Sequence, residues 1–283
     1  MVERQPRSAL LDEALATGGP IVVFDKVSLA FDDKVILRNV SFTLITGRTK
    51  IILGASGAGK STILKLILGL LKPDAGTIHV NGQHIDTMSE RQMMAVRDDI
   101  GMLFQESALF DSLTVADNVG YKLYEETDMP ADAVRRRVED VLGFIGLAGH
   151  IDRMPAELSG GQRRRVAIGR AIAARPRLVL FDAPTSGLDP ITARSVDNEI
   201  VKLRDLEGVS SIVVTHQLRD AFYVAEHMAS RQNGELRFDK SPPKKADEAE
   251  FIMLKDGRIA FEGNASELRE AATKDPYIEA FLS

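Results

Sequence analysis

The sequence predicts an α/β fold with a parallel core sheet, a small antiparallel β subdomain and an inserted helical subdomain. Short apolar runs recur along the chain, and segments with helical spacing separate them. The clearest run, residues 50–53, leads directly into a glycine-rich loop and then into an apolar helix that opens at Ile63. With 283 residues, of which 44% are hydrophobic, the chain is long enough for one large domain.

The loop after this strand has the pattern G-x-x-x-x-G-K-S. The predicted phosphate-binding residues are Gly54, Ala55, Ser56, Gly57, Ala58, Gly59, Lys60, Ser61 and Thr62. Between a strand and a helix, such a loop turns backbone N–H groups toward an anion, and the helix N-terminus adds partial positive charge. Lys60 can reach terminal phosphates, and the Ser61 hydroxyl can ligate Mg²⁺. The sequence therefore predicts a P-loop that binds a nucleoside triphosphate.

Composition excludes several classes of protein. The net charge of −5 argues against a protein held mainly to nucleic acid by electrostatics. Without cysteine, there are no disulfides, cysteine nucleophiles or thiolate metal sites. The N-terminus lacks an apolar signal-peptide core, and no segment reaches the roughly 18 apolar residues of a membrane-spanning helix. We expect a cytoplasmic protein, and any membrane role would have to go through a partner.

The chain before Gln105 is predicted to supply a lead-in and two sheets. Residues 1–20 show no sustained period and are expected to be a loose lead-in. Strands over 21–24 and 27–31, with one or two more over 35–45, predict the small antiparallel sheet. Phe31 fits either a platform for a nucleotide base or an ordinary strand aromatic, and the sequence leaves both open. A buried strand over 100–104 places Gln105 at its carboxyl end, where doubly wound sheets position ligand contacts.

A helical subdomain is expected over about 106–165. Near its end, Leu158 is followed by Ser159, Gly160, Gly161 and Gln162, a second helix N-terminus with Ser159 as the cap. The strand at 178–181 then ends at Asp182, the expected partner of Mg²⁺ in a P-loop protein. His216 follows the strand at 211–215, a position that favours function over a structural role.

The remaining chain is expected to complete the domain, which spans residues 21–283. Residues 230–250 are predicted to be an exposed polar insertion. Two strands, 251–254 and 258–261, flank a turn at Asp256 and Gly257. Residues 265–283 are predicted to form a C-terminal helical arm. Its apolar side chains could dock on this domain, on a second copy or on an accessory protein.

Five elements occur in one order: the loop at 54–62, Gln105, residues 158–162, residues 181–189 and His216. From Ile21 to its end, the chain resembles the ATP-binding subunits of ABC transporters. The resemblance implies that two copies close head to tail over two ATP molecules, so that the loop of one faces Ser159, Gly160 and Gly161 of the other. The resemblance further implies that Gln105 contacts Mg²⁺ and senses the membrane partner, and that His216 holds the γ-phosphate and the attacking water. It implies that Phe31 stacks on adenine. Gln162 and Asp189 are implied to belong to the nucleotide-binding residues.

A narrower resemblance is to the ATPases of Mla-type, MCE-associated phospholipid transport systems. It depends on residues 103–115 and on the tail at 276–283. It implies an integral membrane permease, an MCE-domain protein and a small accessory protein as partners, with the chain peripheral on the inner face of the cell membrane. An importer for another solute is the alternative. Leu109 and Phe110 fit a groove for the permease or the helical subdomain's own core equally well.

The sequence departs from the family at Ala183. ABC ATPases carry a glutamate directly after the strand-terminal aspartate, and that glutamate polarises the attacking water. A methyl group cannot accept a proton or orient water, so the catalytic set of Gln105, Asp182 and His216 lacks its base. Two functions follow: a transporter ATPase in a hydrolysis-impaired form, or an ATP-dependent clamp that regulates a partner without turnover.

Overall fold

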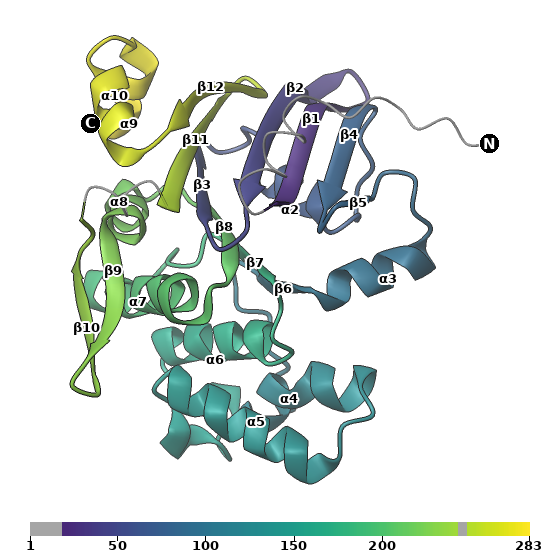
Figure 1. Cartoon of the computed structure of the whole chain (residues 1–283), viewed down its shortest axis with the longest axis vertical. Helices are drawn as coiled ribbons and strands as arrows, with labels where there is room; N and C mark the ends of the chain where they lie inside the picture. The colour runs from purple at the N-terminus through teal and green to yellow at the C-terminus, as the bar shows by residue number, and fades with distance from the viewer. Residues whose placement is uncertain (1–18, 243–247) are drawn as a thin grey trace.

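The central sheet of the molecule has six strands in the order β12-β11-β3-β8-β7-β6 (Figure 1). This computed structural model describes residues 19–242 and 248–283. All neighbouring pairs are parallel except β11 and β12, which confirms the predicted parallel core. The strands are β3 (Thr49–Gly54), β6 (Ile100–Leu103), β7 (Leu178–Asp182), β8 (Ser210–Val214), β11 (Ala249–Lys255) and β12 (Arg258–Gly263).

Both faces of this sheet are covered, which explains why its strands read as continuous apolar runs. Along β3, Ile51 and Leu53 belong to one hydrophobic cluster and Ile52 to the cluster on the other face. One charged side chain also lies within the sheet: Lys50 is 1% exposed and pairs with Glu250 and, at 2.8 Å, with Glu262. These pairs tie β3 to β11 and β12.

A second, antiparallel sheet has the order β2-β1-β4-β5. Its strands are β1 (Pro20–Phe31), β2 (Lys34–Ile45), β4 (Ala75–Val80) and β5 (Gln83–His84). The antiparallel subdomain is thus confirmed, but the two strands predicted over 21–31 are one. Lys26 has a left-handed backbone (φ 52), and the register with β2 shifts between Phe24 and Val27. A bulge therefore interrupts the alternation without ending the strand.

Helices cover the two faces of the central sheet. They are α2 (Lys60–Ile67), α3 (Glu90–Asp98), α7 (Pro190–Glu207), α8 (Leu218–Glu226), α9 (Ala265–Ala272) and α10 (Pro276–Leu282). Buried side chains of α2 and α3 join the antiparallel sheet in one cluster, whereas those of α7 to α10 belong to the other. Within residues 19–242 and 248–283, no helix has the length and apolarity needed to cross a membrane.

Three helices form the lower part of the molecule in Figure 1, where α6 packs on β6 and α7 of the main body. They are α4 (Val115–Glu126), α5 (Ala131–Phe144) and α6 (Gly160–Ile172). Asn118 of α4 is fully buried. Its amide accepts from Phe110 N (2.8 Å) and donates to the carbonyls of Phe110, Leu113 and Thr114 (3.0 to 3.1 Å). This side chain fixes the loop that joins the helices to the sheet.

The two apolar residues of that loop differ in burial. Leu109 is half-buried and packs against the hydrophobic cluster that joins the helical subdomain to the central sheet. Phe110 is 41% exposed, with its ring centroid 4.5 Å from that of Tyr121 and 5.6 Å from the Arg170 guanidinium carbon. Leu109 therefore belongs to the domain's own core, and Phe110 contributes to an exposed aromatic surface.

The polar stretch after α8 contains a hairpin that the sequence analysis did not predict. Strands β9 (His227–Gln232) and β10 (Glu235–Lys240) form their own antiparallel sheet beside α7 (Figure 1). Asn233 and Gly234 both have positive φ, as a type I′ turn requires. This Asn-Gly pair was the signal that could have revealed the hairpin.

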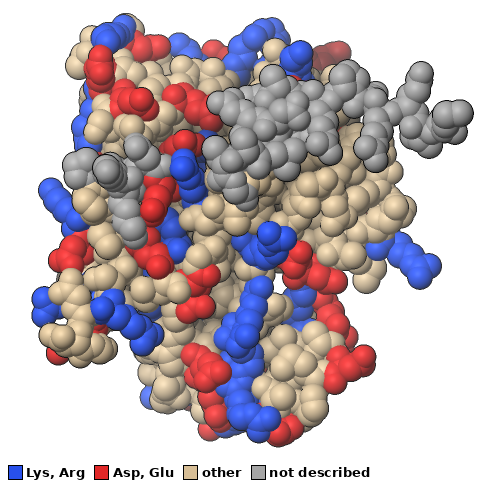
Figure 2. Space-filling model, in the orientation of Figure 1, with Lys and Arg blue, Asp and Glu red and all other residues tan. Residues whose placement is uncertain are grey.

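The last two helices pack on their own domain. Ile278 is 2% exposed, and Tyr277, Phe281 and Leu282 contact the same hydrophobic cluster. Charged side chains of both signs are interspersed over most of the face in Figure 2, and a narrow strip of Lys and Arg runs down its lower centre between acidic residues.

Candidate nucleotide-binding site

An open cavity of about 610 Å³ lies at the carboxyl ends of β3, β7 and β8. It is lined by Lys34, Ile36, Ser56, Gly57, Gly59, Lys60, Ser61, Thr62, Gln105, Asp182, Ala183, Val214, Thr215 and His216. Residues far apart in the sequence therefore meet around the predicted phosphate loop. Parallel strands place ligand sites at this edge of a sheet.

The loop turns into α2 at Gly59, whose φ of 97° is left-handed. A Cβ atom at this position would lie 2.8 Å from Leu37 Cδ2 and 3.1 Å from the Ile36 carbonyl. Only glycine meets both the backbone and the space requirement here. The helix N-terminus at Lys60 consequently opens into the cavity, with the N–H groups of its first turn available to an anion.

Lys60 lies across the start of its own loop. Its Nζ donates hydrogen bonds of 2.8 Å to the carbonyls of Gly54 and Ala55. Burial lowers the pKa of the Lys60 ammonium, and the nearby Asp182 carboxylate opposes that shift. A cation this close to the loop is placed to pair with phosphate oxygens.

Ser61 and Asp182 are in direct contact at the floor of the cavity. The Ser61 hydroxyl donates to Asp182 Oδ1 at 3.0 Å, and Gln105 lines the same cavity. Among the described residues, no group of three or more His, Cys, Asp or Glu side chains could hold a metal ion. The oxygens of Ser61, Asp182 and Gln105 fit Mg²⁺, a hard cation that keeps some ligands from phosphate and water.

Ala183 follows Asp182 at the cavity wall. It is 8% exposed, has a left-handed backbone (φ 46) and donates from its N–H to the Val214 carbonyl at 2.8 Å. Of the described cavity-lining residues, Asp182 alone carries a carboxylate. His216 is exposed at the mouth, and the Gln217 amide that follows it donates to Thr215 Oγ1 at 3.0 Å.

Within the predicted loop, Gly54, Ala55 and Ala58 do not line this cavity, and two further groups of predicted site residues also lie outside it. At the start of α6, Ser159 is exposed and its Oγ accepts from the N–H of Gln162, while Gly160 and Gly161 form the first turn. Asp189 caps α7 by accepting from Ile191 N and Thr192 N.

Phe31 also stands outside the cavity. It is 47% exposed at the end of β1. Its register partner is Lys34, which lines the cavity, so the ring lies beside the site.

Arg164 is a residue that the sequence analysis missed. It is 5% exposed and donates to the carbonyls of Phe104 (3.0 Å), Gln105 and Ser186 (3.3 Å). One guanidinium therefore joins α6, the segment at Gln105 and the loop after Ala183. No local pattern distinguishes it from its neighbours Arg163 and Arg165, because its role depends on contacts distant in the sequence.

Two buried carboxyl groups, one on α7 and one on α8, lie close enough to affect each other electrostatically. Asp197 of α7 and Asp220 of α8 are 1% and 3% exposed, and each has an Oδ2 atom without a hydrogen-bond partner among the described residues. Burial raises the pKa of Asp197 to about 8; Asp220 adds to the shift, and Arg194 and Arg219 oppose it.

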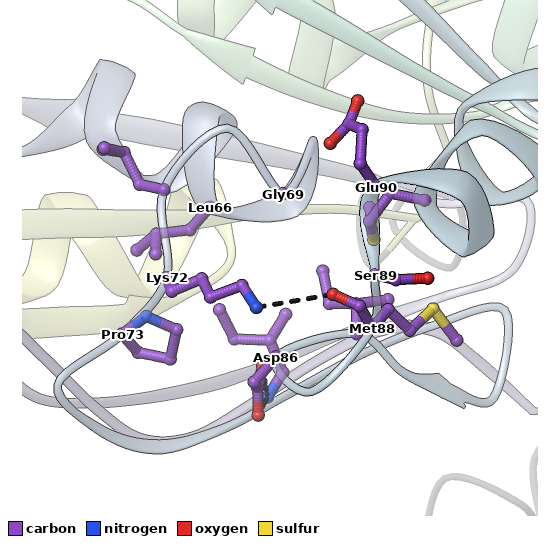
Figure 3. Close-up of a pocket in the computed structure, with 12 residues that line it drawn as sticks. Leu66, Gly69, Lys72, Pro73, Asp86, Met88, Ser89 and Glu90 are labelled. Carbon is purple, nitrogen blue, oxygen red and sulfur yellow. Dashed lines mark hydrogen bonds between the residues drawn. The ribbon is translucent and has the colours of Figure 1, made fainter.

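A smaller cavity of about 230 Å³ lies near the carboxyl end of α2 (Figure 3). Lys72 points across it and donates to the Met88 carbonyl at 3.4 Å, with Asp86 and Glu90 at the rim. None of the predicted site residues lines this smaller cavity. The cavity at the phosphate loop is therefore the candidate nucleotide-binding site.

Comparison with known proteins identifies the family. The family model described as "ABC transporter" matches residues 37–186. The chain belongs to the ABC transporter family. This ABC protein is 37% identical over 256 residues to the "Intermembrane phospholipid transport system ATP-binding protein MlaF" of Escherichia coli (strain K12), covering 90% of this chain and 86% of that protein. It is 40% identical over 200 residues to the "Methionine import ATP-binding protein MetN" of the same strain, covering 71% and 58%.

The fold of this ABC protein also matches solved cassettes. A dimeric post-hydrolysis state of the ATP-binding cassette MJ0796, bound to ADP and Pi, aligns with a TM-score of 0.70 and 28% identity. The alignment covers 86% of this chain and 98% of that cassette. The α/β P-loop fold with parallel core sheet is thereby confirmed, and the chain is an ABC ATP-binding subunit.

Proposed function

We propose that this subunit powers a membrane transporter of phospholipids through ATP-driven closure of a head-to-tail dimer. The observation that carries the proposal is the single cavity in which Lys60, Ser61, Gln105, Asp182 and His216 meet. The similarity to MlaF over 90% of the chain supports the lipid assignment. The proposed partners are an integral membrane permease, an MCE-domain protein and a small accessory protein. Through the permease, the subunit would lie on the inner face of the cell membrane.

Within the proposed site, each group has a chemical task. The loop at 54–62 and Lys60 bind the phosphates of ATP, and Phe31 stacks on the base. Ser61, Asp182 and Gln105 hold Mg²⁺, which would neutralise phosphate charge. Ser159, Gly160, Gly161, Gln162 and Asp189 act from the second copy. Their position outside the cavity of their own chain and the exposure of Ser159 support this assignment.

We further propose that Ala183 makes ATP hydrolysis very slow. The binding groups are present, but the position that follows Asp182 has no side chain able to orient water or accept a proton. General-base help is typically worth about 10²–10⁴-fold in rate, or roughly 3–5 kcal/mol of barrier. His216 remains at the cavity, so some turnover should persist.

The test is the substitution Ala183→Glu. The left-handed backbone at this position already accommodates a Cβ atom, because Ala183 carries one at φ 46. Glutamate therefore fits the same backbone and adds a carboxylate at the cavity wall. We expect ATP turnover to rise by about 10²–10⁴-fold while ATP affinity stays within about two-fold. Ala183→Gln is the matched control, because glutamine has the shape of glutamate but no carboxylate to act as the base. Equal turnover in the original chain and the Glu variant would refute the role of this position.

Two alternatives follow from specific observations. Ala183 itself favours a non-hydrolysing clamp that binds ATP and regulates a partner. Under that function, Ala183→Glu would raise turnover without stimulating transport by the assembled complex. The 40% identity to MetN favours an importer of another solute. The chains that copurify with this subunit distinguish such an importer from a lipid transporter, since a permease with a periplasmic MCE-domain protein supports lipid transport.

A further inference from the structure

The C-terminal helix α10 reaches the start of the phosphate loop through one side chain, Tyr277. The Tyr277 hydroxyl donates a hydrogen bond of 3.0 Å to the carbonyl of Leu254 in β11. Leu254 is the register partner of Gly54, where β3 passes into the loop. A Cβ atom on Gly54 would lie 2.8 Å from that same carbonyl oxygen. The phenol hydroxyl therefore sits where the loop leaves the sheet.

Tyr277 also lies beside the loop itself, because it lines one cavity together with Ala55, Ser56 and Gly57. Burial raises the pKa of the Tyr277 phenol, and the nearby backbone of Ala55 opposes the shift. The Ala55 carbonyl, in turn, accepts from Lys60 Nζ at 2.8 Å. Ala55 therefore lies between Tyr277, which lines the same cavity, and Lys60, the residue placed to bind phosphate.

Tyr277 is itself held firmly. The Asp275 side chain caps α10 by accepting from the Tyr277 N–H at 2.8 Å, and the adjacent Ile278 is 2% exposed. Lys255 Nζ lies 4.5 Å from the centroid of the Tyr277 ring. Together with Ser56, these two residues line a cavity of about 300 Å³ on the phosphate loop. A side chain anchored in this way can fix the loop it contacts.

We infer that Tyr277 is a positioning residue for ATP binding, through which α10 holds the first turn of the phosphate loop. The inference rests on the proposed nucleotide site. An anion nest binds well when its N–H groups are already ordered, because less conformational entropy is lost on binding. Tyr277 contributes to the ordering of these N–H groups from a helix that lies more than 200 residues after Ala55 in the sequence.

The test is ATP affinity of the full chain with Tyr277→Phe, which removes the hydroxyl and keeps the ring. Loss of one hydrogen bond that orders the loop should weaken ATP binding by about 3- to 10-fold in calorimetry. The melting temperature without nucleotide should change little. Phe281→Leu is the control, because Phe281 packs on the hydrophobic cluster and takes no part in the contacts with the loop. It should lower the melting temperature and leave affinity unchanged.

The outcomes separate this inference from the proposed site. If Lys60→Ala leaves ATP affinity unchanged, the nucleotide site itself is misassigned. If Lys60→Ala weakens binding and Tyr277→Phe does not, the site stands and the role of Tyr277 is refuted. Equal losses of affinity in Tyr277→Phe and Phe281→Leu would also refute it, because general docking of α10 would then be the cause.

Discussion

Replacing Asp197 by asparagine should remove a large part of the pH dependence of stability. The Asp197 carboxyl is buried beside Asp220, and its pKa in the folded chain is about 8 against a reference of 3.8. A folded-state pKa above the unfolded value stabilises the fold fully below the unfolded pKa, and this stabilisation is lost as pH rises through the folded pKa. The relevant window is therefore about pH 4–8.

The magnitude follows from proton linkage. Between pH 6 and pH 8 the unfolded chain has Asp197 ionised, whereas the folded chain retains most of its proton until close to pH 8. At about 1.4 kcal/mol per pH unit, and allowing for partial ionisation near the pKa, this carboxyl costs the fold about 2 kcal/mol over that interval. Asparagine has nearly the same shape and does not titrate.

The assay is urea unfolding of the original chain and of Asp197→Asn at pH 6 and pH 8. The free energy of unfolding of Asp197→Asn, relative to the original chain, should rise by about 2 kcal/mol between the two pH values. Asp140→Asn is the matched control, because Asp140 is an exposed carboxylate on α5. Parallel pH dependence in the original chain and in Asp197→Asn would refute the reasoning.

Three further substitutions test other contacts. Lys60→Ala should weaken ATP binding by about 10- to 100-fold, because it removes a charge-assisted hydrogen bond to phosphate; unchanged affinity in calorimetry would contradict this. Asn118→Ala should lower the free energy of unfolding by about 3 kcal/mol, since four hydrogen bonds of a buried amide are lost; a loss below about 1 kcal/mol in urea unfolding would contradict it. Gly161→Ala places a Cβ 2.1 Å from Thr192 Cγ2 and should cost about 1–3 kcal/mol; the same urea assay should show recovery with Thr192→Ser, and no recovery would exclude this clash as the cause.

The strands and the phosphate loop could be predicted because their signals are local. A buried parallel strand is a continuous apolar run, and the run at 50–53 became part of β3. The loop motif combines glycines, a lysine and a hydroxyl within a few residues. Asp182 ends a strand, and Gln105 and His216 lie two residues beyond the ends of two others. Topology therefore predicted that they meet at one edge of the sheet, and all three line the cavity there.

What could not be predicted depends on contacts between distant segments. Arg164 resembles the surface arginines around it until the loops at Gln105 and Ser186 are placed against it. The Asn118 amide has no pattern that distinguishes a core polar group from a surface one. The hairpin of β9 and β10 was missed although Leu236 and Phe238 alternate with charged residues along β10. Strand β9 lacks this alternation, and both strands stand in a largely polar stretch of the sequence.

The place of β3 in the central sheet has a consequence for synthesis of the protein. This strand lies between β8 and β11, and its Lys50 pairs with Glu250, a separation of 200 residues. Strand β3 has neither neighbour until the ribosome has made β8 at residues 210–214, and it lacks β11 until residues 249–255 are made. Closing such long loops is slow. We expect the antiparallel sheet to form early, whereas the phosphate loop acquires its supporting strands only when the last quarter of the chain has emerged. The nascent subunit should therefore be unable to bind ATP until its synthesis is nearly finished.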